Sequence, residues 1–191
     1  MIFLQSMHTI RKRICFLFGR ARFVFNGREA RKIVTVNFIE TEEELEKVLK
    51  LCYRLLAPQL MATLPGQEIT ENIEKEITEN IYAYNAWKQR IKEYSRLLLY
   101  AKKDGEIAAA VLGRPENKES LVCGMAVCDE KFRRQGIAKM LMENFAENAR
   151  SIGFHYITLG ADKNAEIFYE KCGFHKIFEI HGQTIYQKML I

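Results

Sequence analysis

The order of apolar and polar positions along the chain predicts strands that alternate with helices from residue 33 onward. Short apolar or β-branched runs bounded by turn residues predict strands at residues 33–39, 97–101, 106–112, 120–127, 157–160, 177–180 and 185–190. Apolar residues that recur at helical spacing predict helices at residues 41–58, 67–96, 137–149 and 164–171. Strands and helices that interleave in this way are typical of an α/β layered sheet.

Local signals place the ends of some of these elements. Thr41 and Glu44 have the spacing of a capping box, so the first helix is expected to begin there and to end near Pro58. Asp104 and Gly105 form a strong turn signal between the second and third strands, which predicts a hairpin.

The segment 133–138, with the sequence Arg-Arg-Gln-Gly-Ile-Ala, lies where an apolar strand ends and a long amphipathic helix begins. The first turn of a helix has N–H groups without intrahelical partners and a partial positive charge, so it attracts anions. Gly136 and Ala138 are small enough for a ligand to approach the main chain, and Arg133 and Arg134 add charge. The segment predicts a phosphate or pyrophosphate site, although an exposed basic helix start has the same appearance in isolation.

Neighbouring residues exclude two common phosphate motifs. No Gly-Lys-Ser/Thr closes the loop, so it is not a Walker A motif, and the glycines of a dinucleotide fingerprint are missing. The loop instead resembles the acyl-coenzyme A loop of the GNAT acyltransferase superfamily, Gln/Arg-x-x-Gly-x-Gly/Ala, with Arg133, Gly136 and Ala138 in the defined positions. Residues 162–174 resemble the closing motif of the same family, in which an alanine is followed by Phe-Tyr-Glu-Lys and then Gly-Phe.

This resemblance extends from about residue 97 to the C-terminus, is weaker over residues 33–96 and is absent before them. It implies an α/β GNAT fold, with a mixed and strongly twisted central sheet of about six or seven strands and helices on both faces. In that fold two neighbouring parallel strands splay apart to hold the cofactor. Here they would be residues 121–127 and 156–160.

The resemblance also implies which residues bind the cofactor. In the family, the main chain of the strand before the loop pairs with the pantetheine arm, and the loop holds the pyrophosphate. The implied residues are Met125, Ala126, Val127, Arg133, Arg134, Gln135, Gly136, Ile137, Ala138 and Asn164. Met125 and Val127 also fit ordinary core packing, and both uses are compatible because one involves the backbone and the other the side chain.

Tyr169 lies at the position where many family members have a tyrosine that donates a proton to the departing thiolate. A hydroxyl with a pKa near 10 is protonated at neutral pH and can act as a general acid. The competing interpretation is that Tyr169 packs beside Phe168. The family often has asparagine seven residues earlier, where this chain has Asp162 with Asn164 two positions later. Both polar residues also fit a helix N-cap.

The sequence identifies neither a general base nor an acceptor. Four acids near the motifs are candidates for the base: Glu106, Glu119, Asp129 and Glu130. Aromatic residues of the second helical region either line an acceptor pocket or pack against the sheet, and packing is the preferred interpretation. These aromatic residues are Tyr82, Tyr84, Trp87 and Tyr94.

The net charge of +5 belongs to the N-terminal segment. Residues 1–32 contain eight Lys or Arg and one Glu, so this segment carries +7 and residues 33–191 carry −2. We expect a GNAT domain at residues 33–191 and a basic extension at residues 1–32, either poorly ordered or preceding the true start, with a partner-binding arm as the alternative. The apolar pieces of the extension are too short for a signal peptide or a membrane span.

Cysteine and histidine usage favours a reducing compartment and no metal site. The five cysteines form no C-x-x-C pair, so the cytoplasm is the expected location. The four histidines are too scattered to suggest a metal site. Cys52 and Cys123 fit buried thiols, and a reactive role for Cys172 is disfavoured.

Together these features predict an acyl-coenzyme A dependent N-acyltransferase that transfers acetyl from acetyl-coenzyme A to an amine by direct attack in a ternary complex. The acceptor is either a small-molecule amine or a protein amine, and a homodimer is compatible with the sequence. Two alternatives stay open. One is a GNAT-fold sensor that binds acyl-coenzyme A without turnover, and the other is nucleic-acid association through the basic extension, which is disfavoured.

Overall fold

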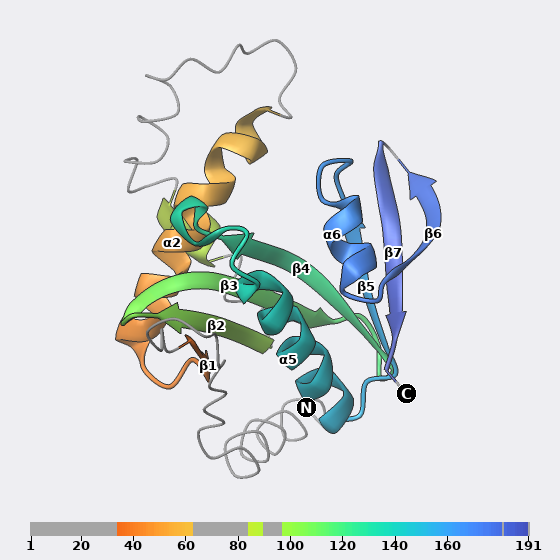
Figure 1. Cartoon of the computed structure of the whole chain (residues 1–191), viewed down its shortest axis with the longest axis horizontal. Coiled ribbons are helices and arrows are strands. Elements are labelled where there is room, and N and C mark those ends of the chain that lie inside the picture. The colour runs from red at the N-terminus through yellow and green to blue at the C-terminus, as the bar shows by residue number, and fades with distance from the viewer. Residues whose placement is uncertain (1–33, 63–83, 90–96, 181, 191) are drawn as a thin grey trace.

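Seven strands form one mixed sheet in the computed structural model, which describes residues 34–62, 84–89, 97–180 and 182–190. The strand order is β1-β2-β3-β4-β5-β7-β6, and β4–β5 is the parallel pair (Figure 1). The strands are β1 Val34–Phe38, β2 Leu97–Lys103, β3 Glu106–Pro115, β4 Ser120–Cys128, β5 Tyr156–Ala161, β6 His175–Ile180 and β7 Gln183–Met189. The prediction of an α/β fold with six or seven strands is confirmed.

Helices cover both faces of this sheet, also as predicted. The described helices are α2 Glu42–Ala62, residues 84–89, α5 Ile137–Ser151 and α6 Glu166–Lys171, together with the 3₁₀ turn η1 Glu130–Phe132. α2 and α5 lie on opposite faces, because alternate side chains of β2 enter two separate clusters of buried residues. None of the described helices has the length and apolar character needed to cross a membrane.

The first helix is longer than predicted. We expected it to end near Pro58, but α2 continues to Ala62. Proline lacks an N–H donor, yet its fixed φ is compatible with helical backbone, so it weakens a helix without always ending it. At the other end, Glu44 N–H donates to Thr41 Oγ1 at 3.1 Å, as a capping box requires. In a standard capping box the Glu44 carboxylate would accept from the N–H of Thr41. Here it accepts instead from the N–H of Glu40, one residue earlier.

The C-terminal elements also differ slightly from prediction. β6 begins at His175, two residues earlier than expected, and α6 begins at Glu166, two residues later. The hairpin turn between β2 and β3 is confirmed, with φ of 53° at Asp104 and 87° at Gly105. Most of the predicted helix at 67–96 and the whole extension at 1–32 lie outside the described residues.

β4 contains a bulge that exchanges the two faces of the strand. Leu112 pairs with Met125 but Gly113 pairs with Cys123, so Gly124 is the extra residue. Before the bulge, Cys123 packs into the cluster under α5, and after it Met125 packs into the cluster under α2. The strand therefore contributes to both cores, and the bulge lies where β4 leaves its parallel neighbour.

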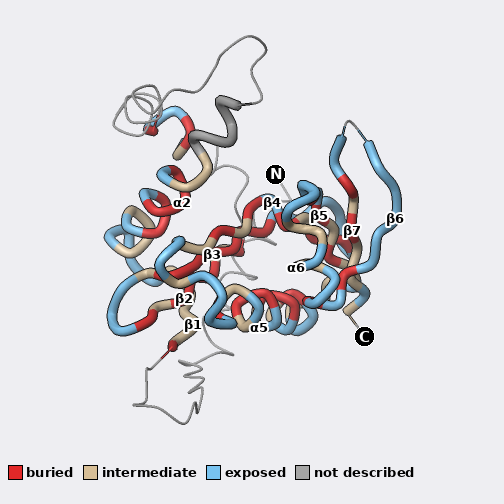
Figure 2. Tube along the Cα trace, turned by 45° about the horizontal axis from the view of Figure 1, so that its top comes forward, coloured by how far each residue is buried: buried red, intermediate tan, exposed pale blue. Residues whose placement is uncertain are grey.

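Burial is concentrated in the central strands and the inner side of α5, whereas β6 is exposed along its whole length (Figure 2). In the centre, Gly113 on β3 allows Phe145 of α5 to approach the sheet closely. A Cβ atom at Gly113 would lie 2.7 Å from Phe145 Cζ. α5 is therefore packed on the sheet so closely that any side chain at position 113 would have to displace the Phe145 ring.

We expect Gly113→Ala to lower the free energy of unfolding by about 1–3 kcal/mol, because the added methyl overpacks the contact with Phe145. Chemical denaturation measures this change. Gly124→Ala is the matched control, because a Cβ there meets no atom within 4 Å. Combining Gly113→Ala with Phe145→Leu should cost less than the sum of the two single changes. Strict additivity would show that the contact is not the cause.

Candidate functional site

The parallel strands β4 and β5 pair over only three residues and then diverge. The pairs are Ser120 with Tyr156, Leu121 with Ile157 and Val122 with Thr158. Beyond them, β4 stays paired with β3 as far as Cys128, and β5 stays paired with β7 as far as Ala161. The sheet therefore opens between its fourth and fifth strands (Figure 1), and the predicted splay is confirmed.

Main-chain groups of β4 are directed into this gap. Asp129 N–H donates to Ala108 C=O at 2.9 Å, so Asp129 faces β3. Because successive residues of a strand direct their N–H and C=O groups to opposite sides, Ala126 and Cys128 face the gap, and Met125 and Val127 face β3. The side chains of Met125 and Val127 are buried under α2. Their predicted packing is therefore confirmed. Their main-chain groups face β3, so of the three strand residues implied to bind the cofactor only Ala126 presents its backbone to the gap.

The start of α5 lies directly after this open strand and has no side-chain cap. Gly136 is the N-cap residue, with a left-handed φ of 79°, and Arg134 has a φ of 61°. The helical ladder begins with Met140 N–H donating to Gly136 C=O at 3.0 Å, so the N–H groups of Ile137 and Ala138 precede it. Left-handed residues within such a turn help N–H groups to converge, as in anion-binding nests.

The two arginines of the loop have different surroundings. Arg133 Nε donates to Cys128 C=O at 3.3 Å, and its guanidinium lies 3.2 Å from the Glu130 carboxylate. Arg133 therefore holds the end of β4. Arg134 is exposed and forms no ion pair within the described ranges. Its charge is available to a ligand.

Gln135 ties the loop to the β2–β3 hairpin. Its side-chain oxygen accepts from Lys103 Nζ, and its amide nitrogen donates to Lys131 C=O at 3.0 Å. The Lys131 side chain in turn pairs with Glu106 at the start of β3. Sequence analysis did not select Lys103, because two lysines at the end of an apolar strand are typical of an exposed strand end.

Tyr169 lies on α6 and is partly buried against the core. Its ring contacts Phe168 and Phe174, with centroids 5.1 Å and 5.9 Å away. Burial raises the pKa of the Tyr169 hydroxyl above its usual value, and the thiols of Cys123 and Cys172 add to the shift. The Tyr169 ring packs against the core cluster under α5, to which Cys123 of β4 also belongs. The predicted packing of Tyr169 beside Phe168 is therefore confirmed.

An open strand edge therefore leads, through the turn at residues 129–136, to an uncapped helix start. Residues 61–184 match the sequence model of the acetyltransferase (GNAT) domain family. The chain belongs to the GNAT family. A search of curated proteins finds no match.

Solved structures with the same fold include several acetyltransferases. One is the PaiA N-acetyltransferase of Thermoplasma acidophilum in complex with coenzyme A, with 18% identity, a TM-score of 0.61 and coverage of 82% of this chain and 98% of that chain. Another is an aminoglycoside 6′-N-acetyltransferase complexed with coenzyme A, with 14% identity, a TM-score of 0.60 and coverage of 82% and 97%. YncA of Salmonella typhimurium, solved with acetyl-CoA, has 15% identity, a TM-score of 0.56 and coverage of 83% and 94%. At these identities the likeness establishes the GNAT fold.

The polar residues before α6 do not cap it. Asn164 and Asp162 are exposed in the turn after β5, and the N-cap of α6 is Ala165, without a side-chain hydrogen bond. The N-cap interpretation of these residues is therefore wrong. Their side chains stay exposed in the turn that follows β5.

Three of the four candidate bases of this GNAT domain are engaged in ion pairs. Glu106 pairs with Lys131, Asp129 with Arg54 at 2.5 Å, and Glu130 with Arg133. The fourth, Glu119, lies where β4 and β5 are still joined, because its C=O accepts from the N–H groups at the start of β5. None of them stands alone at the gap within the described part of the chain.

The aromatic residues that fall within the described ranges pack in the core. Tyr84 and Trp87 are buried and contact Tyr53 of α2, with ring centroids 5.3 Å and 5.4 Å from it. The preferred interpretation is confirmed for these two residues, while Tyr82 and Tyr94 lie outside the described residues. The predicted buried thiols are also confirmed, since Cys52 and Cys123 both lie in the core, and this burial raises the pKa of each thiol to about 12.

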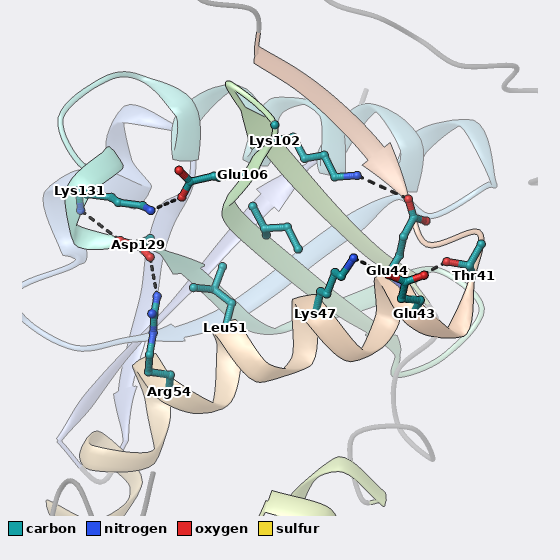
Figure 3. A pocket seen from close by; sticks show the side chains of 12 residues that line it. Thr41, Glu43, Glu44, Lys47, Leu51, Arg54, Lys102, Glu106, Asp129 and Lys131 are labelled. Atoms are coloured by element: carbon teal, nitrogen blue, oxygen red, sulfur yellow. Dashed lines mark hydrogen bonds and ion pairs between the residues drawn. The ribbon is translucent and has the colours of Figure 1, made fainter. Parts of the chain in front are cut away.

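A cavity of about 570 Å³ lies between α2, the β2–β3 turn and η1 (Figure 3). Its lining contains four cations and four acids that pair with one another. These pairs are Lys47–Glu43, Arg54–Asp129, Lys102–Glu44 and Lys131–Glu106. The charges are therefore internally balanced, and the Arg54 pair ties α2 to the end of β4.

Proposed function

We propose that this protein is an N-acyltransferase that transfers an acyl group, with acetyl the expected one, from acyl-coenzyme A to an amine. The observation that carries the proposal is the opening of β4 and β5 directly beside the uncapped start of α5. Such a gap presents a strand edge to an amide-containing chain and helix N–H groups to a phosphate. Coenzyme A contains both, joined in one molecule.

The residues divide the binding between them. The main-chain groups of Ala126 and the N–H of Cys128 would hydrogen-bond the pantetheine amides, since the Cys128 C=O already accepts from Arg133. Met125 and Val127 shape the strand from the core. The N–H groups from Gly136 to Ala138, with the Arg134 guanidinium, would hold the pyrophosphate. Asn164, exposed at the end of β5, would reach the pantetheine arm from the other side of the gap. The described residues contain no cluster of acids, histidines and cysteines suited to a metal.

The chemistry requires little beyond positioning. The amine nitrogen attacks the thioester carbonyl, a C–N bond forms, and the C–S bond breaks to release the thiolate. Gap-facing N–H groups of β4 stabilise the oxyanion of the tetrahedral state. Tyr169 donates a hydrogen bond, and then its proton, to the departing sulfur. Solvent water takes up the proton that the amine loses and returns a proton to Tyr169, so the residue is ready for the next turnover. Holding amine and thioester together supplies a large part of the rate enhancement.

We expect purified protein to release free thiol from acetyl-coenzyme A when a suitable amine is present. A panel of small amines, diamines and lysine peptides should show release above background for at least one class, measured with a thiol reagent. Mass spectrometry of the acylated product identifies the acceptor. Coenzyme A binding without thiol release for any amine would contradict the enzyme proposal and favour the sensor.

A further inference from the structure

Lys103, at the end of β2, is the one charged side chain that is buried in the described part of the chain, with 9% of its surface exposed. Lysine is rarely buried without an acidic partner, because removing an ammonium group from water is costly. Here the ammonium donates to the neutral side-chain oxygen of Gln135. Across the described ranges it forms no ion pair.

The acid nearest in register does not compensate this charge. Glu106 lies directly opposite Lys103 in the β2–β3 hairpin, but its carboxylate pairs with Lys131. Gln135, which holds the ammonium, stands between Arg134 and Gly136 at the start of α5. A buried ammonium, an exposed guanidinium and the positive end of a helix therefore gather at one place without a balancing acid.

We propose that Lys103 is an additional cofactor-binding residue, whose charge is held against the loop by Gln135 and favours the phosphate groups of the acyl donor. The inference rests on the proposed function, since the donor supplies those phosphates. A charge in a buried position acts over several ångströms, because the surrounding protein screens it less than water does. Lys103 can therefore act on a phosphate at the loop without touching it.

The neighbouring Lys102 provides a natural contrast. It extends from the opposite face of the same strand, lies 3.6 Å from the Glu44 carboxylate and stands 5.3 Å from the centre of the Tyr100 ring. Its charge is already balanced on the α2 side of the sheet. Lys102 and Lys103 are thus adjacent lysines, but the first is paired with an acid and the second is buried without one.

The test measures the dissociation constant of coenzyme A by calorimetry for the wild type, Lys103→Met, Lys103→Arg and Lys102→Met. We expect Lys103→Met to bind about tenfold more weakly at low salt, since it removes one positive charge facing a multiply charged anion. The difference should narrow at high salt. Lys103→Arg should stay within about threefold of the wild type because it keeps the charge, and Lys102→Met should bind normally.

Each other outcome rejects the inference. Equal affinity of Lys103→Met and the wild type would show that the ammonium does not act on the cofactor. If Lys103→Arg were as weak as Lys103→Met, or if the loss were the same at high salt, the side chain would act through its shape as a brace. Thermal melting verifies that each variant folds. A folded wild type that does not bind coenzyme A would reject the proposed function itself.

Discussion

Tyr169→Phe is expected to lower kcat for amine acetylation by about 10²-fold or more, the usual range for loss of a positioned general acid. The coenzyme A affinity should change little, because the ring that packs between Phe168 and Phe174 is retained. The initial rate of thiol release at saturating acetyl-coenzyme A measures kcat, and calorimetry measures the affinity for coenzyme A. A loss confined to kcat indicates an interaction made in the transition state.

A second tyrosine serves as the matched control. Tyr186 of β7 is buried, and its hydroxyl donates to the Glu170 carboxylate at 3.2 Å. Tyr186→Phe also removes one buried hydroxyl, yet kcat should stay near the wild-type value because this hydroxyl is engaged elsewhere. Equal turnover of Tyr169→Phe and the wild type would remove Tyr169 from the mechanism.

The pH profile gives an independent check on the same residue. Burial raises the pKa of Tyr169, so the protonated and competent form persists as the pH passes the usual tyrosine value near 10. The wild-type kcat should therefore show no decline at pH 10, provided that the protein remains folded. A decline centred at or below that pH, absent from Tyr169→Phe, would contradict the burial of the acid.

Gly136→Glu is expected to weaken coenzyme A binding by about 100-fold or more, which corresponds to about 2.7 kcal/mol. The substitution places bulk and negative charge where the pyrophosphate would lie. A Cβ at this position meets no atom within 4 Å, so the folded protein can accommodate the side chain. The left-handed φ of 79° adds strain of about 1–2 kcal/mol to the folded state. Calorimetry at a temperature well below the melting point separates binding from stability.

Gly153→Glu, just beyond the other end of α5, isolates the contribution of charge at the loop. Gly153 also has a left-handed φ, of 98°, and a Cβ there meets no atom within 4 Å. The two variants therefore share the backbone strain and the added charge but differ in distance from the loop. If both lost affinity equally, the effect would come from net charge or from strain. Unchanged affinity in a folded Gly136→Glu protein would place the pyrophosphate elsewhere.

The parts of the fold that sequence predicted are those set by local chemistry. The left-handed turn at Asp104 and Gly105, the apolar run that became β4 and the helical spacing after Gly136 each have a short-range cause. The helix boundary at Pro58 was wrong for the opposite reason. A proline lowers helix stability locally, but packing of the rest of α2 on the sheet determines whether the helix continues.

The remaining features depend on pairing between distant segments. The bulge at Gly124 is visible only once β4 is aligned with β3, and it decides which residues of β4 face the α2 side. The engagement of Arg133 with Cys128 C=O and the burial of Lys103 likewise depend on where a loop and a strand end meet. Composition and residue spacing do not predict such contacts. The sequence therefore assigned Arg133 and Arg134 the same role and gave no sign that Lys103 is buried.

Because only three residue pairs join β4 to β5, a ligand bound between these strands is expected to affect the stability of the protein. An acyl donor in the gap would hydrogen-bond to the main chain of β4 on one side and reach Asn164 on the other. It would therefore connect two halves of the sheet whose strands pair directly over only three residues. Any ligand that binds only the folded form adds to its stability, by about 2.7 kcal/mol at a concentration 100 times the dissociation constant. The amount of folded protein in a cell would then follow the supply of the ligand that occupies the gap.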